Sequence, residues 1–380
     1  MSSSNPQGHT VLFAASMVSM ALGSIHAFSV FLAPLEIAFG TSRATVSLIY
    51  SFGLVFLTAT VLFGPTVYSR LQPATISIWV AFLGAIGAGV ASIADGYWLV
   101  WVGYSLIFGI ANGLGYGFGL QLAARANPNQ AGLAMGVVTA SYALGAVLAP
   151  YGFDVALTYG GFFLAMAGLG SVVVVVSIGA AVLVARSGVK YTDTQAARRV
   201  THLPVGLIAM IWVAYGSGVA AGLMAIGHAA EIAATAGFAG WIAAATIAGF
   251  NLVGSLLSGW LSDRISHRHI LTTLPVIGAT ALLALAVLPE QTLVLLGVVG
   301  FAYGGTIATY PAAIANLFPG EDGPRAYGRV FTAWGAAGLV APWLAGQIYD
   351  WTGHYTTALW AAAALGILSA VMAQKVIRQR

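Results

Sequence analysis

Long apolar stretches alternate with short polar connections along almost the whole chain. Most of these stretches contain about the ~20 residues that a helix needs to cross the hydrocarbon core of a bilayer. The pattern therefore predicts an all-α membrane protein with twelve transmembrane helices. The predicted spans cover residues 10–34, 45–67, 74–94, 98–123, 131–151, 158–185, 204–229, 238–261, 270–288, 292–317, 327–348 and 355–376.

The basic residues are confined to alternate connections between these spans. Of the 14 Lys and Arg residues, only Arg43 falls on the side opposite the others. Because positive loops remain in the cytoplasm, we expect both termini and the central polar segment to face inward. The expected location is a cell membrane, and specifically a bacterial inner membrane, crossed many times by one chain.

Composition supports this interpretation. The chain is 59% hydrophobic and only 6% charged, whereas soluble proteins carry about a quarter charged residues. There is no cysteine, which excludes disulfides and thiolate metal sites. Since the spans show no nucleophile–base–acid constellation and the loops are short, we expect neither an enzyme nor a resident cofactor or metal, and no nucleic-acid partner.

The spans divide into two halves of six that resemble each other. The sequence GAVLAP at Gly145–Pro150 in the fifth span is echoed by AGLVAP at Ala337–Pro342 in the eleventh. We therefore expect an N-terminal half over residues 1–185, a cytoplasmic linker over 186–203 and a C-terminal half over 204–380. Two six-helix halves related by an axis along the membrane normal describe the major facilitator fold, in which substrate binds near the midplane between them.

One loop strengthens this assignment. GWLSDRISHRHIL, at Gly259–Leu271, resembles the signature loop G-x-L-a-D-r-x-G-r-k of the major facilitator superfamily. The resemblance implies that Asp263 and Arg264 form a conformational latch between neighbouring helices.

Three further segments, Gly23–Phe52, Tyr303–Phe318 and Tyr327–Tyr355, resemble the oxalate/formate antiporter and monocarboxylate transporter families. Those families imply a small organic anion as substrate. Their anion-binding basic residues are missing here, because residues 238–261 and 330–349 contain no charge. A dicarboxylate such as oxalate is therefore a poor fit.

Without fixed cations, a histidine inside the membrane is the best candidate for anion binding. His26 shares one helical stripe with Ser16, Ser19 and Gly23. A protonated imidazole would attract a carboxylate and couple its movement to a proton, since its ordinary pKa of ~6.5 lies near physiological pH. The alternative is a neutral histidine that hydrogen-bonds a neighbouring helix.

His228, in the seventh span, is a second candidate for proton coupling. It lies one helical turn from Glu231 and could pair with it. Its spacing from Met224, together with Met17 and Met20, also allows a copper site, although methionines at helical spacing more often pack in cores.

Other polar and aromatic residues of the spans complete the predicted substrate pocket, and each could instead serve helix packing. The predicted substrate-binding set is His26, Asn112, Tyr116, Tyr142, Tyr215, Asn251, Tyr303, Tyr310 and Trp334. Arg43, the lone outward cation, either attracts an anion to the outer surface or extends towards the interface as a snorkelling side chain.

These observations favour a secondary transporter of a small organic anion, most simply a monocarboxylate moved by symport with protons. We expect it to act as a monomer in the lipid bilayer. The alternatives are an exporter of neutral or lipophilic compounds, a copper transporter that uses Met and His ligands, and a membrane receptor or assembly factor without transport.

Overall fold

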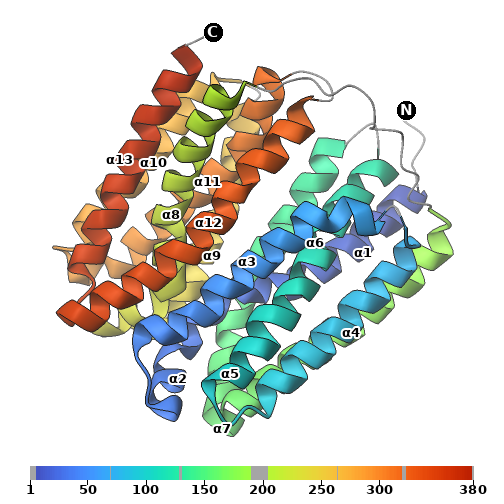
Figure 1. Cartoon of the computed structure of the whole chain (residues 1–380), viewed down its shortest axis with the longest axis horizontal. Helices are drawn as coiled ribbons and strands as arrows, with labels where there is room; N and C mark the ends of the chain where they lie inside the picture. Colours follow the sequence, from blue (N-terminus) through green and yellow to red (C-terminus); the bar gives the residue numbers. More distant parts are fainter. Residues whose placement is uncertain are drawn as a thin grey trace. The chain divides into compact units, whose positions relative to one another are not determined.

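The computed structural model describes residues 6–68, 70–127, 131–189, 204–262, 264–318 and 322–378. These ranges are almost entirely helical and contain no strand, which confirms the all-α prediction (Figure 1). The helices are α1 (Pro6–Leu22), η1 (Gly23–Phe31), α2 (Leu32–Phe39), α3 (Arg43–Tyr68), α4 (Pro73–Ser92), α5 (Tyr97–Val100), η2 (Trp101–Phe108), α6 (Gly109–Ala126), α7 (Ala131–Ser187), α8 (Val205–Thr235), α9 (Gly240–Ser262), α10 (His267–Leu285), η4 (Pro289–Gln291), α11 (Thr292–Leu317), α12 (Asp322–Thr352) and α13 (Thr356–Arg378).

Ten helical stretches in the described ranges are long and apolar enough to cross a membrane. One of them, Ala134–Ser187, covers 54 residues and contains both the fifth and the sixth predicted spans. The eleventh predicted span lies in α12, which has 31 residues and carries more charge at its ends. All twelve predicted spans therefore correspond to helices of this multi-pass membrane fold.

The break between the fifth and sixth spans lies later than the apolar pattern predicts. Helix α7 continues through residues 152–157, which were expected to form a turn, and breaks at Gly160 and Gly161. Gly161 has a φ of +63°, a conformation that only glycine adopts without strain. The chain reverses there, so α7 consists of two arms.

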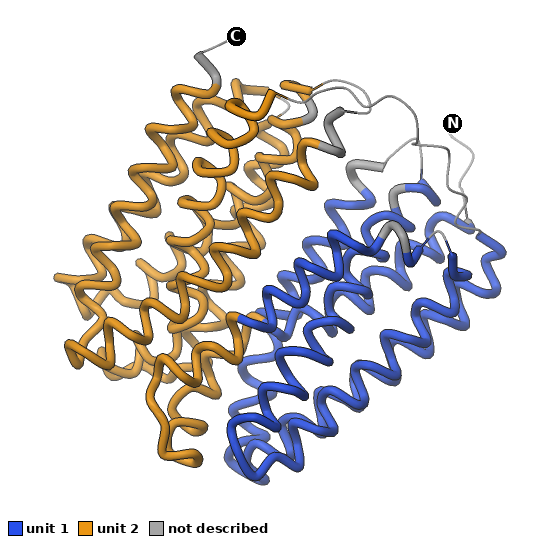
Figure 2. Tube along the Cα trace, viewed as in Figure 1, with its two compact units in different colours: residues 1–25, 52–194 blue, residues 26–51, 195–380 orange. Residues whose placement is uncertain are grey.

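The described chain forms two compact units (Figure 2). Unit 1 contains residues 1–25 and 52–194, and unit 2 contains residues 26–51 and 195–380. This division differs from the predicted halves in one segment. Residues 26–51, which belong to the first half of the sequence, pack with helices of the second half.

Within each unit, glycines allow helices to approach backbone to backbone, as is common in membranes. In unit 1, a Cβ on Gly23 would overlap the backbone of Tyr142, and one on Gly145 would overlap the backbone of Met20. These two glycines face each other's helix across the contact between α1 and α7. In unit 2, Gly254 and Gly300 do the same between α9 and α11.

Candidate functional site

His26 lies in η1, where the α-helical winding of the first span tightens into a 3₁₀ helix. Its Nδ1 atom lies 2.7 Å from the hydroxyl oxygen of Tyr50 in α3. The imidazole also meets the rings of Tyr50 and Trp334 edge to face, with centroids 6.1 and 6.4 Å away. The histidine is partly buried, so it lies in an aromatic and hydroxyl-lined environment within unit 2.

Trp334 connects His26 to a second predicted residue. Its indole Nε1–H donates to the Tyr303 hydroxyl at 3.1 Å, and its ring stacks on Phe331 with centroids 5.6 Å apart. Three predicted substrate-binding residues, His26, Tyr303 and Trp334, are thus linked in unit 2. We call these three residues and Tyr50 the His26 group.

A related arrangement occurs in unit 1. The Tyr142 hydroxyl donates to Asn112 Oδ1 at 2.9 Å, and Asn112 Nδ2 donates to the Leu22 carbonyl at 2.6 Å. Tyr142 and Trp334 occupy the same position in the internal repeat, so each unit contains a hydrogen bond from that position to the preceding span. Tyr116 packs on Tyr142 with ring centroids 4.7 Å apart. Asn112 is fully buried, and its hydrogen bonds with Tyr142 and the Leu22 carbonyl hold neighbouring helices together.

The remaining predicted substrate residues lie in other contacts of unit 2. The rings of Tyr215 and Tyr310 pack against each other with centroids 4.6 Å apart, and apolar residues such as Ile211 and Ile314 surround Tyr310. Asn251 accepts a hydrogen bond from Ser255 of its own helix and lies against Gly304. The structure gives these three residues contacts that are typical of helix packing.

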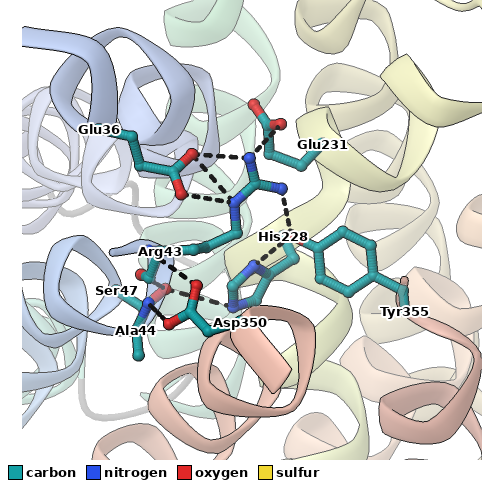
Figure 3. Close-up of polar contacts among 8 residues, drawn as sticks. All are labelled: Glu36, Arg43, Ala44, Ser47, His228, Glu231, Asp350 and Tyr355. Carbon is teal, nitrogen blue, oxygen red and sulfur yellow. Dashed lines mark hydrogen bonds and ion pairs between the residues drawn. The ribbon is translucent and has the colours of Figure 1, made fainter. Parts of the chain in front are cut away.

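A charged cluster lies in unit 2, on the side that is predicted to face outward (Figure 3). It consists of Glu36, Arg43, His228, Glu231, Asp350 and Tyr355. Arg43 Nε lies 3.0 Å from both carboxylate oxygens of Glu36, and Nη2 lies 2.6 Å from Glu36 and 3.1 Å from Glu231. The guanidinium also lies 4.1 Å above the ring of Tyr349. The Arg43 side chain is only 8% exposed, so the expectation of a snorkelling arginine is wrong.

The predicted pairing of His228 with Glu231 is also not what the structure shows. Glu231 pairs with Arg43 instead, while His228 Nδ1 lies 2.9 Å from the Tyr355 hydroxyl and Nε2 lies 2.8 Å from the Pro342 carbonyl. A full guanidinium charge attracts the carboxylate more strongly than a neutral imidazole does. Helical spacing places His228 and Glu231 close enough to pair, but Arg43 pairs with Glu231 instead.

The hydrogen bonds around His228 have defined directions. Arg43 Nη1 can only donate, so the Tyr355 oxygen accepts from it at 3.0 Å. The Tyr355 hydroxyl then donates to His228 Nδ1, and Nε2–H donates to the Pro342 carbonyl, which can only accept. His228 therefore carries a proton on Nε2, and in the neutral form of its ring Nδ1 accepts from the Tyr355 hydroxyl. Tyr355 lies between α12 and α13, and burial raises the pKa of its hydroxyl, so this donor stays protonated.

Asp350 joins the cluster to the start of α3. Its two carboxylate oxygens accept hydrogen bonds from the backbone amides of Arg43 at 3.1 Å and Ala44 at 2.9 Å. These amides belong to the first turn of α3, where the helix provides no acceptors and its dipole favours negative charge. A carboxylate from α12 thus caps α3.

Both ring nitrogens of His228 are hydrogen-bonded, so copper binding there would have to replace one of these bonds, and the copper interpretation stays a prediction. Across the described ranges, no group of three or more His, Asp or Glu side chains could hold a metal ion. Arg264 lies in the turn after α9 and contacts the end of that helix, through the Trp260 carbonyl at 2.9 Å and the Trp260 ring at 3.8 Å. Its predicted latch partner Asp263 lies outside the described residues, so the latch stays a prediction.

The charged cluster is not evident as a unit from the sequence. Glu36, Asp350 and Tyr355 were not among the candidate residues. One feature of the sequence indicated it. Arg43 is the lone basic residue on the predicted outer side, so the acidic residues of that side have no other Lys or Arg there to pair with.

Comparisons with known proteins agree with this fold. The sequence model of the Major Facilitator Superfamily matches residues 206–380. A relative from Escherichia coli K12, the uncharacterized MFS-type transporter YhjX, is 23% identical over 343 residues, which cover 85% of this chain and 84% of the relative.

Two solved structures resemble the whole chain. The inward-open xylose transporter XylE from E. coli has a TM-score of 0.78 at 14% identity, and the match covers 97% of this chain and 96% of that one. An inward-facing, unoccupied bacterial homologue of the human lysosomal transporter Spinster has a TM-score of 0.73 at 14% identity and covers 99% and 95% of the two chains. The resemblance to the major facilitator superfamily is thus confirmed, while the narrower likeness to oxalate/formate and monocarboxylate carriers stays a prediction.

Proposed function

We propose that the protein is a secondary transporter that moves a small monocarboxylate together with a proton by alternating access. The similar proteins described above are named as transporters, and both solved structures are inward-facing or inward-open states. A major facilitator fold presents its binding site alternately to the two sides of the membrane. Transport is thus the function that this fold supports best.

The observation that carries the substrate class is the His26 group. It combines an ionisable imidazole, the tyrosine hydroxyl at 2.7 Å from it and the indole of Trp334. A protonated imidazole can bind one carboxylate, and the hydroxyls can donate to its oxygens, while the aromatic rings suit a short apolar tail. One reversible charge matches a monoanion better than a dianion.

Uptake into liposomes that contain the purified protein tests this proposal. Labelled lactate represents the monocarboxylates and labelled oxalate the dicarboxylates, each with and without an imposed proton gradient. We expect lactate to accumulate only when the outside is acidic, and oxalate to remain near the level of empty liposomes. Equal accumulation of lactate with and without the gradient would contradict proton coupling.

One observation favours a second candidate, an exporter of lipophilic compounds. Unit 1 contains a cavity of about 350 Å³ lined almost entirely by apolar side chains, among them Met20, Leu148, Phe153 and Val172. A cavity of this size and polarity suits an uncharged molecule. Cells that lack the protein would then become sensitive to lipophilic toxins and would keep their growth on organic acids.

A further inference from the structure

The charged cluster of unit 2 contains more negative than positive charge. Two carboxylates, from Glu36 and Glu231, lie against the single guanidinium of Arg43, and a third, from Asp350, binds the backbone amide of the same residue. Glu36 and Glu231 both lie within 3.1 Å of the same nitrogen, Nη2. Their side chains are only 18% and 15% exposed, so water can screen their repulsion only in part. A buried surplus of charge is costly, and proteins commonly remove it by protonation.

The neighbouring groups do not balance this surplus. The charge of Asp350 is stabilised by the two backbone amides at the start of α3. His228 is held neutral, because a proton on Nδ1 would leave the Tyr355 hydroxyl hydrogen without its acceptor and place a second cation near Arg43. Tyr349 contributes only its ring to the guanidinium.

Glu36 and Glu231 differ in the number of contacts that each makes with the Arg43 guanidinium. Glu36 receives hydrogen bonds from Nε and Nη2, so its carboxylate takes a whole edge of the guanidinium. Glu231 has a single contact with Arg43, at 3.1 Å, and a hydrogen bond with the backbone of Ala33. A neutral carboxylic acid can still accept both of these bonds through its oxygens. The proton is therefore better placed on Glu231 than on Glu36.

We propose that Glu231 is a proton-binding site, and that protonation of its carboxylate allows residues 26–51 to dock on α8 and α12. The cluster connects α2 and α3 to these helices through Arg43 and Asp350, and Gly346 of α12 lies directly against Ala44 and Ser47 of α3. Docking of this segment thus requires a proton, and undocking releases it. This proposal rests on the proposed function only for its role in coupling, in which the proton on Glu231 is the one moved with the substrate.

Proton binding gives the docking equilibrium a defined dependence on pH. Docked protein holds one more proton than undocked protein, so acid favours docking and alkali opposes it. For a single linked proton, the docking equilibrium constant changes by up to about tenfold per pH unit. Glutamine at position 231 imitates the neutral acid and should make docking independent of pH.

Distance measurements between two spin labels test the proposal without substrate. The chain has no cysteine, so Ile37→Cys in α2 and Trp351→Cys in α12 can be labelled directly; both positions are well exposed, at 84% and 73%. The labelled full-length protein is measured in lipid nanodiscs from about pH 5 to about pH 9, a range in which one linked proton would shift the equilibrium fully. We expect the short-distance population to decrease as the pH rises.

Four variants make the test specific. Glu231→Gln should keep the short distance over the whole range, whereas Glu231→Asp, which keeps a carboxylate, should respond to pH. Glu290→Gln removes an exposed carboxylate and should behave like the parent protein. His228→Gln should also keep the pH response.

A pH response that survives in Glu231→Gln, or that disappears only in His228→Gln, would overturn the proposal, as would a parent protein whose distances ignore pH. A failed lactate uptake experiment would refute the proposed substrate and leave these distances unchanged, so the two failures can be told apart.

Discussion

The carboxylate of Asp350 accepts a hydrogen bond from the backbone amide of Arg43 at 3.1 Å, across 307 positions of sequence. Arg43 is the first residue of α3, and Asp350 lies near the end of α12. One side chain therefore both caps a helix and joins residues 26–51 to the second half of the chain. Arg43 is thus held at its backbone by Asp350 and at its side chain by the ion pairs with Glu36 and Glu231.

Asp350→Asn should destabilise the protein by about 1 kcal/mol, because asparagine has one acceptor oxygen for the two backbone amides that the carboxylate binds. The amide of asparagine keeps one acceptor oxygen and loses the negative charge that the start of α3 favours. Chemical unfolding in detergent measures the change. Asp154 is the matched control, because it follows the same repeated motif in the first half and is partly exposed. Equal losses in both variants would contradict the capping role.

Tyr355→Phe should cost about 1–3 kcal/mol, because it leaves a buried donor on Arg43 and the Nδ1 acceptor of His228 without their shared partner. The matched control is Tyr349→Phe, which keeps the ring that contacts the guanidinium. Unfolding of both variants under the same conditions measures the difference.

The effect of Tyr355→Phe should also be constant between about pH 6 and about pH 9. Burial raises the pKa of Tyr355 above its ordinary value near 10, so its hydroxyl is protonated in both the folded and the unfolded chain over this range. Its contribution to stability would decrease only above about pH 10, where the unfolded chain loses this proton. A difference that changes near neutral pH would indicate that the hydroxyl acts through another titrating group.

Gly145→Ala should disrupt the contact between α1 and α7, because the added Cβ would overlap the backbone of Met20. Backbone cannot rotate away as a side chain does, so we expect a loss of about 1–3 kcal/mol. Gly136→Ala is the control in the same helix, since nothing lies within 4 Å of the position that its Cβ would occupy. That substitution should be neutral or slightly stabilising, because alanine favours helix. Comparison of the two unfolding curves tests the contact.

The apolar pattern predicted the fold well because bilayer thickness fixes the length of each span. The boundary between the fifth and sixth spans was less predictable. Residues 152–157 include Gly152 and Asp154, yet the helix continues through them and breaks at Gly160 and Gly161. Periodicity identifies apolar length, whereas the position of a break depends on which glycine can adopt a positive φ.

The candidate site was predictable in part. His26, Tyr303 and Trp334 do meet in unit 2, although their role in binding stays a prediction. The charged cluster was not predictable, because its members come from α2, α3, α8, α12 and the turn before α13. Helical spacing shows which residues share a face of one helix, and it does not show which faces meet.

His26→Gln should reduce the kcat/KM for lactate uptake by about tenfold or more, since it removes the only group of the His26 group that can become positively charged. Glutamine can still hydrogen-bond Tyr50, so the packing around the site should be preserved. His9→Gln is the matched control, because His9 is exposed at the start of α1. Uptake measured at several pH values separates this role from that of Glu231. If His26 binds the anion, His26→Gln lowers uptake at every pH and leaves the spin-label distances responsive to pH. Unchanged lactate uptake in His26→Gln would instead mean that the imidazole only holds η1 against α3.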